Sequence, residues 1–341
     1  MSKIWKELIR GAVLGFVLPA ILVTVVVWAA ERTSESPQAS QTTKPMQTTP
    51  TISKPEAEFS SEVTIPVLLE DHIVMMELEV YLLGVVLSEM PASFESEALK
   101  AQAVAARTFA LKIHTDGYKH MGGAVCANAG CCQGYLSPRD YLDRGWSQEQ
   151  LCKVTQAVRS TQGQVLIYEG KLISATYFAC SGGSTESAAA VWGQDVPYLQ
   201  AVESPGEEET VYFTDRKLFA PEELQNALGI LLEGNPETWF GIAYRTDGGG
   251  IDTIQICGVS YRGTTLRTLL GLRSTMFTVK VTQEGIEFTT YGYGHRVGMS
   301  QYGADAMAMT GSDYRQILDY YYRGAILVEY TKFFQANWDF Y

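Results

Sequence analysis

Hydrophobic positions along the chain form one long run near the start and shorter patterned segments after it. Residues 11–30 are predominantly apolar and uncharged, and about 20 such residues let a helix cross about 30 Å of hydrocarbon. Lys3, Lys6 and Arg10 precede the run, so the positive-inside rule places residues 1–10 in the cytoplasm and the later residues outside. We therefore expect an uncleaved single-pass anchor in the cell membrane. A cleaved signal peptide is the alternative, although its apolar region usually spans only about 7–15 residues.

The next segment, residues 31–62, has a different composition. It is rich in Ser, Thr, Gln, Pro and Glu, and its apolar residues are too few to offset the entropy of ordering. We expect a disordered linker here. The folded, working part of the protein is then an extracytoplasmic domain over residues 63–341.

Helical and strand patterns alternate irregularly in that domain. Residues 63–80 favour short strands, and residues 81–90 form an apolar helical pattern that must end near Pro91. An alanine-rich helix is expected over 96–115, with Ser96 as its N-cap. Further strands are expected at 164–168, 172–179, 251–259, 277–282 and 285–291, and further helices at 147–162, 266–272, 299–309 and 313–322. Mixed elements without a βαβ rhythm predict an α+β fold that bears a cleft.

Charge and composition narrow the function. The formal net charge is -12, and no basic stripe interrupts the acidic surface, which argues against a nucleic-acid partner. Hydrophobic residues make up 46% of the chain, so a sizeable core can form. Six cysteines are too few for a disulfide-built fold but enough for one metal site or a few bridges.

The first chemical candidate is Glu89, at the end of the apolar 81–90 segment. A carboxylate held against apolar side chains loses solvation, so its pKa should rise and it could act as a general acid. Lys100 and Arg107 lie seven residues apart on one face of the next predicted helix. They could receive an anionic ligand group or hold Glu89 ionised. The alternative is an ordinary surface carboxylate beside a solvated charged face.

The second candidate is a loop that contains His120, Cys126, Cys131 and Cys132 within thirteen residues. One imidazole and three thiolates are an ordinary tetrahedral set for structural Zn²⁺. A disulfide such as Cys126 to Cys132 and free structural thiols are the two alternatives, and His114 is a possible substitute ligand. Bound zinc would hold the loop without an open catalytic position.

Two glycine-containing loops are further candidates. In the first, Ser181 and Gly182 could offer a hydroxyl and backbone donors to a sugar, and Glu186 and Trp192 could add a carboxylate and an aromatic platform. In the second, residues 294–302, His295 and Gln301 could contact a glycan. Structural roles are the alternative for both loops.

Four collinear stretches carry a specific resemblance. They are LSEMPASFESEALKAQAVAARTFAL (87–111), YFACSGGSTESAAAVWG (177–193), PYLQAV (197–202) and GYGHRVGMSQYGADAMA (292–308), the last followed by ILDYYYRGA. Together they resemble the stage II sporulation protein D family of lytic transglycosylases across nearly the whole predicted domain.

The resemblance implies cleavage of peptidoglycan glycan strands between N-acetylmuramic acid and N-acetylglucosamine, with 1,6-anhydro ends. The family's catalytic Glu corresponds to Glu89, and its Lys and Arg correspond to Lys100 and Arg107. We expect one of these cations to bind the lactyl carboxylate that removal of the stem peptides exposes. Tyr198 corresponds to a tyrosine that borders the family's cleft.

The chain departs from the family pattern at two positions. Some members carry a zinc site resembling His-x5-Cys-x4-His-Cys, in which Cys131 here replaces the second His; thiolate and imidazole both suit Zn²⁺. The family usually has Gly at position 296, where this chain has Arg296. If the backbone there needs a positive φ, the arginine is strained.

The function that the resemblance implies is wall thinning during engulfment in sporulation, at the mother-cell or septal membrane. The implied partners are a sporulation amidase (stage II sporulation protein P) and stage II sporulation protein M. Two rivals remain: a non-catalytic glycan-binding enhancer of an amidase, and a hydrolase that leaves reducing ends.

Overall fold

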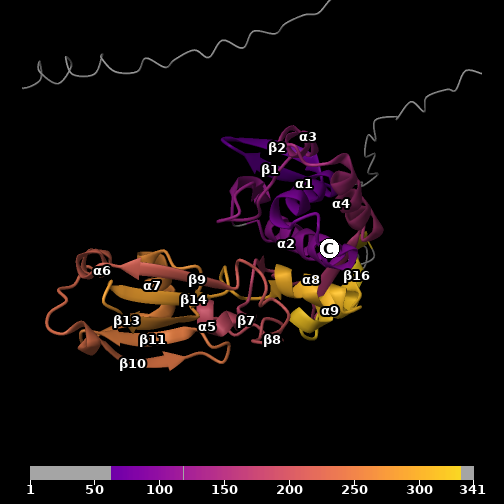
Figure 1. Ribbon diagram of the computed structural model, residues 1–341. Helices are drawn as coiled ribbons and strands as arrows, with labels where there is room; N and C mark the ends of the chain where they lie inside the picture. Colours follow the sequence, from indigo (N-terminus) through magenta and orange to yellow (C-terminus); the bar gives the residue numbers. More distant parts are fainter. Residues whose placement is uncertain (1–62, 118, 332–341) are drawn as a thin grey trace, which may run out of the picture. The chain divides into compact units, whose positions relative to one another are not determined.

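The computed structural model describes residues 63–117 and 119–331 (Figure 1). These residues form a mixed α+β fold, which confirms the predicted class. The anchor expected at 11–30 and the linker expected at 31–62 lie outside the described residues. Among the described residues, no helix combines the length and apolarity needed to cross a membrane.

Two helices position the predicted acid. Helix α1 (Leu78–Glu89) is buried along most of its length and ends before Pro91, where the N–H of Met90 donates to the carbonyl oxygen of Val86. It starts three residues earlier than its apolar pattern predicted. Helix α2 (Ser96–Asp116) ends at Gly117, whose φ of 71° suits glycine.

Alanine allows α2 to pass through the middle of the first core. Its small side chains are almost all buried, and the helix packs against α1 and three further helices, α4 (Gln148–Ser160), α8 (Gln301–Met309) and α9 (Tyr314–Tyr321). The expected N-cap is corrected: Ser96 is the first helical residue, and the cap position belongs to Glu95. The backbone N–H of Glu95 donates to the Asp305 carboxylate at 2.7 Å.

Two small sheets complete this first core. One has the order β2-β1-β3, with β1 (Thr64–Leu69), β2 (His72–Glu77) and β3 (Val125–Cys126). The other has the order β16-β4-β5, with β4 (Gln164–Tyr168), β5 (Lys171–Leu172) and β16 (Ile326–Glu329). The short helix α3 (Pro138–Asp143) precedes α4, which begins with a capping box between Ser147 and Gln150.

A second core forms around Phe219, Phe277 and Phe288. Its sheets have the orders β13-β14-β9 and β10-β11-β12. The strands are β9 (Thr214–Phe219), β10 (Phe240–Arg245), β11 (Ile251–Ile256), β12 (Val259–Arg262), β13 (Phe277–Val281) and β14 (Ile286–Tyr291), with helices α6 (Pro221–Leu228) and α7 (Gly263–Leu270).

Short elements join the segments that carry the predicted sugar-binding loops. Strand β6 (Tyr177–Phe178) pairs in parallel with β15 (Met299–Ser300), and β7 (Gly183–Ser184) pairs with β8 (Glu203–Ser204). The strand predicted over 172–179 is therefore divided into β5 and β6. The remaining elements are α5 (Ala188–Trp192) and the 3₁₀ turns η2 (Met121–Gly123) and η3 (Pro236–Thr238).

Candidate active site and metal centre

Glu89 is the last residue of α1, and its side chain is partly buried. Its Oε1 accepts a hydrogen bond from the backbone N–H of Gly134. Burial raises the pKa of Glu89 above its ordinary value, and the Gly134 hydrogen bond opposes part of that rise. The rise in pKa expected from the sequence is therefore confirmed, with desolvation as its main cause.

Glu89 lines two pockets. The first has a volume of 370 Å³ and includes Lys119, Trp192 and His295. The second has a volume of 460 Å³, and its walls include five aromatic side chains: Tyr141, Trp146, Tyr212, Tyr293 and Tyr302. Among the described residues that line these pockets, Glu89 is the only carboxylate. The site thus offers one acid that is shared by the linings of two concave surfaces.

The segment that reaches Glu89 is fixed by Gln133, a buried residue next to Gly134. The Gln133 amide accepts a hydrogen bond from the Tyr81 hydroxyl at 3.2 Å and donates to the Ala106 carbonyl oxygen and the Tyr177 hydroxyl, at 3.2 and 2.9 Å. Every one of these partners lies on α1, α2 or β6. The position of the Gly134 N–H is therefore set by the first core.

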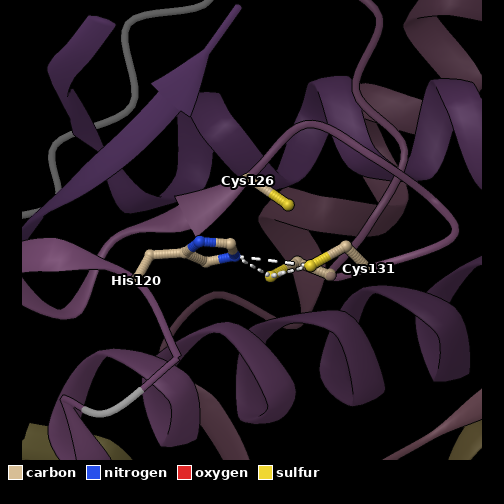
Figure 2. A group of neighbouring side chains, drawn as sticks. His120, Cys126 and Cys131 are labelled. Atoms are coloured by element: carbon tan, nitrogen blue, oxygen red, sulfur yellow. Dashed lines mark hydrogen bonds between the residues drawn. The ribbon is translucent and has the colours of Figure 1, made fainter. Parts of the chain in front are cut away.

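The four predicted metal ligands come together at the start of the same segment. The ligand atoms of His120, Cys126, Cys131 and Cys132 all lie within 4.8 Å of one another. Figure 2 shows the His120 ring directed at the thiols, with its Nε2 3.4 Å from the Cys131 sulfur and 3.3 Å from the Cys132 sulfur. The two adjacent sulfurs are 4.0 Å apart.

These separations fit a tetrahedral zinc site. With Zn–S near 2.3 Å and Zn–N near 2.0–2.1 Å, the edges of the tetrahedron are roughly 3.5–3.8 Å. All six cysteines of the chain have free thiols, so the alternative Cys126–Cys132 disulfide is not formed. His114, the possible substitute ligand, instead directs its Nδ1 at the carbonyl oxygen of Gly123, 3.2 Å away. The donor set is therefore a candidate metal centre, and Cys131 and Cys132 also line the first pocket.

The two cations predicted to accompany Glu89 lie elsewhere. Arg107 is fully buried and forms a two-pronged ion pair with Glu79, at 2.8 and 2.6 Å. A guanidinium without exposed surface cannot reach a glycan or hold Glu89 ionised, so the expected role of Arg107 is corrected to core stabilisation. Lys100 pairs with Glu97 at 2.6 Å and lines neither pocket.

The first glycine-containing loop is also directed inward. Ser181 is fully buried, and both its N–H and its hydroxyl donate to the Glu207 carboxylate, at 2.6 and 2.8 Å. Gly182 is buried against the backbone of Gly292. Glu207 thus occupies the Ser181 donors that were expected to bind sugar, and neither Ser181 nor Gly182 lines a pocket, which corrects that expectation. Tyr198 lines neither pocket, and its hydroxyl accepts a hydrogen bond from the N–H of Ser174.

The other loop does supply pocket residues. His295 lines the first pocket, where burial, aided by the positive charge of Arg267, lowers its pKa to about 4. Its Nδ1 accepts the N–H of Val297 at 3.1 Å, so the neutral ring carries its proton on Nε2. Gln301 lines the second pocket, 3.4 Å from the amide oxygen of Gln102.

The backbone of Arg296 has a positive φ of 66°, which is the strained conformation considered for this position in the sequence. Its buried guanidinium donates to the carbonyl oxygens of Ser181, Ser184 and Gly248, each at 2.7 Å, and lies 3.3 Å from the Glu186 carboxylate. Glu186 is thereby buried as the partner of this arginine and is not a second acid of the pockets. The backbone strain is offset by a network that ties the two loops together.

Sequence reasoning missed two residues that line the pockets and one that donates a hydrogen bond to Glu89. Trp146 follows α3, a helix that was not expected; Lys119 precedes the metal ligands; and Gly134 follows them. The exposed Trp146 between two polar segments was a detectable signal. The approach of Gly134 to Glu89 was not, because 45 residues separate them.

Comparison with known proteins identifies the family of this chain. A family model described as stage II sporulation protein matches residues 70–168. Stage II sporulation protein D of Bacillus subtilis (strain 168) is 38% identical over 295 residues, which cover 84% of this chain and 85% of the relative. This chain belongs to the stage II sporulation protein D family.

Two further relatives extend the comparison. Stage II sporulation protein D of Bacillus amyloliquefaciens is 39% identical over 280 residues, covering 80% of this chain and 81% of the relative. A protein of Bacillus subtilis (strain 168) named amidase enhancer is 30% identical over 305 residues, covering 72% of this chain and 40% of that protein. The family resemblance drawn from the four motifs is confirmed, and with it a link to sporulation.

Proposed function

We propose that this protein is a peptidoglycan lytic transglycosylase that cleaves peptide-stripped glycan strands during sporulation. One observation carries the proposal: Glu89, with its raised pKa, is the only carboxylate among the described residues that line the two adjoining pockets. Most glycoside hydrolases need two carboxylates, one as acid and one as nucleophile or base. A lytic enzyme needs only one, because the nucleophile belongs to the sugar.

The chemistry assigns both proton transfers to Glu89. Its Oε1 accepts the Gly134 N–H, which leaves Oε2 to carry the acidic proton. That proton passes to the bridging oxygen as the bond from C1 of N-acetylmuramic acid to this oxygen breaks. The C6 hydroxyl oxygen of the same sugar then bonds to C1, and its proton returns to the carboxylate. The products are a 1,6-anhydro end and a free N-acetylglucosamine hydroxyl, and no water is consumed.

The walls of the pockets suit a polysaccharide. Trp192 in the first pocket and Trp146 in the second are both exposed, so each pocket offers an aromatic ring to a sugar. Gln301 can exchange hydrogen bonds with hydroxyl or acetamido groups, whereas neutral His295 is held by a hydrogen bond to the backbone of Tyr177 and contributes the face or edge of its ring. Both volumes lie in the range of about 300–1,000 Å³ that is common for ligand pockets.

The candidate metal centre has a positioning role in this proposal. Zn²⁺, when bound, would fix the loop that carries Gln133 and Gly134. Its four ligands would be His120, Cys126, Cys131 and Cys132, which leaves no open position for catalysis. The loop residues then hold the Gly134 N–H against the acid.

The decisive experiment is analysis of products by mass spectrometry. The purified protein should release 1,6-anhydro-muramic fragments from peptide-stripped glycan, and Glu89→Gln should reduce the rate by at least about 10²–10⁴-fold. A hydrolase would give fragments heavier by one water. Reducing-end products, or an unchanged rate in Glu89→Gln, would refute the proposal.

The relative named amidase enhancer supports a second candidate, a glycan-binding partner that activates a cell-wall amidase. That function would leave the amidase stimulation of Glu89→Gln intact while the chain alone released no anhydro product. The proposed setting is the outer face of the mother-cell or septal membrane. The proposed partners there are the sporulation amidase, stage II sporulation protein P, and stage II sporulation protein M.

A further inference from the structure

Lys119 provides the positive charge of the candidate active site. It lines the first pocket together with Glu89, Trp192 and His295. Among the described residues that line either pocket, it is the only lysine or arginine. In a chain of net charge -12, a single cation beside the acid is a specific feature of this pocket.

The contacts of Lys119 hold its ammonium group in place and leave some of its N–H donors unused. Its Nζ donates to the backbone carbonyl oxygen of Cys131 and lies 5.9 Å from the centre of the Phe109 ring. A lysine ammonium has three N–H donors, and the carbonyl takes one. The others remain for an anionic group that enters the pocket.

The other lysines and arginines that the structure describes line neither pocket. Arg107 is buried against Glu79, and Lys100 is paired with Glu97 outside both pockets. His295 is neutral near pH 7 because its pKa is lowered to about 4. The second pocket, with its aromatic walls, has no charged side chain apart from Glu89 among the described residues.

We propose that Lys119 binds the free lactyl carboxylate of N-acetylmuramic acid and thereby selects peptide-stripped strands. This inference rests on the proposed function and names the specificity residue of the same site. It also orients the strand: the charged muramic ring occupies the first pocket, beside Lys119, and the neutral N-acetylglucosamine occupies the second. The scissile bond between these two sugars then lies at Glu89, the residue that both pockets share.

Binding to a catalytically silent background tests this assignment. Glu89→Gln protein, with and without Lys119→Met, is titrated with two glycans by calorimetry. One carries free lactyl carboxylates, and the other is the same material with those carboxylates converted to primary amides. Lys119→Met should weaken binding of the acid form about tenfold, the effect of losing a charge-assisted hydrogen bond, and leave binding of the amide form unchanged. Lys119→Arg should keep the preference for the acid form.

Lys112→Met is the matched control. Lys112 lies on α2, pairs with Asp116 at 2.9 Å and lines neither pocket, so its removal should change neither affinity. Zinc content and thermal unfolding are measured on every variant. Equal weakening of both glycans by Lys119→Met, or no weakening of either, would overturn the assignment.

The design separates this inference from the proposed function. A wild-type protein that releases no anhydro product but binds the acid form through Lys119 would refute the lyase and retain the carboxylate subsite. Anhydro products that form equally well from the acid and amide glycans would retain the lyase and refute the subsite.

Discussion

A single methyl group at Gly134 tests how strictly the loop positions the acid. A Cβ added there would lie 2.6 Å from the Ser88 Oγ and 3.0 Å from the Glu89 Oε1. Ordinary contact begins at 3.4 Å, so the serine hydroxyl must move by about 0.8 Å and the carboxylate by about 0.4 Å. Misplacement of a catalytic group by about 1 Å can cost about 10²-fold in rate.

We therefore expect Gly134→Ala to lower the rate of anhydro-product formation by roughly 10-fold to 10²-fold. Both crowded atoms end side chains that can shift, so the cost in stability should be at most the 1–3 kcal/mol or so that is typical of overpacking. Initial rates on peptide-stripped glycan measure the first effect, and thermal unfolding measures the second.

The matched control is Gly241→Ala in strand β10, which adds a methyl group 3.2 Å from the side chain of Gln255 in β11 and lies outside both pockets. It should lose little activity. If Gly134→Ala retained the wild-type rate while folded, the backbone at 134 would not be what positions Glu89. A loss of rate that merely followed a loss of folded protein would equally contradict the argument.

Three other outcomes are expected. Because burial raises the folded-state pKa of Glu89, the protonated side chain stabilises the fold below its unfolded pKa, and that contribution is lost as pH rises through the raised value. Glu89→Gln should therefore melt at a higher temperature than wild type at neutral pH, and the difference in melting temperature should shrink towards pH 4. Wild-type turnover should fall as pH rises through the same pKa. A difference in melting temperature that stayed constant with pH would contradict this. Arg107→Met leaves the buried Glu79 unpaired and should destabilise the protein by about 3–5 kcal/mol in denaturant titration, and the double variant with Glu79→Leu should recover much of it. Cys126→Ser should reduce bound zinc below one per chain and lower activity. Cys152→Ser removes an exposed thiol outside the cluster and should do neither. Equal zinc content in the two variants would exclude the metal centre.

Local patterns predicted the first core well and the second core in part, since β11, β13, β14 and α7 were expected there and β9, β10, β12 and α6 were not. Helices α1 and α2 follow from an apolar run, a proline stop and an alanine-rich stretch, all of which act within a few residues. Strand β9 reads TDRKLF, and β10 is exposed along most of its length, so neither shows the alternation that identifies a strand. Strand β9 is stabilised by pairing with β14, which is distant in sequence, and β10 by pairing with β11, which follows it in a hairpin.

The same distinction holds for the site. The metal ligands lie within thirteen residues, so their spacing in the sequence was enough to predict that they form one group. A heptad spacing placed Lys100 and Arg107 on one face of a helix but did not reveal that Glu79 covers one of them. The Ser181 loop was misjudged for a related reason, since its acceptor, Glu207, comes 26 residues later.

The hydrogen bond from Gly134 to Glu89 has a consequence for how such chains are recognised. Residues 87–111 carry the most diagnostic stretch of sequence, yet the donor that fixes the carboxylate lies well beyond them. A truncated or spliced homologue that kept this stretch and lost the cysteine loop would match the family and still lack a positioned proton donor. Surveys of genomes for active wall-cleaving members should therefore require both segments.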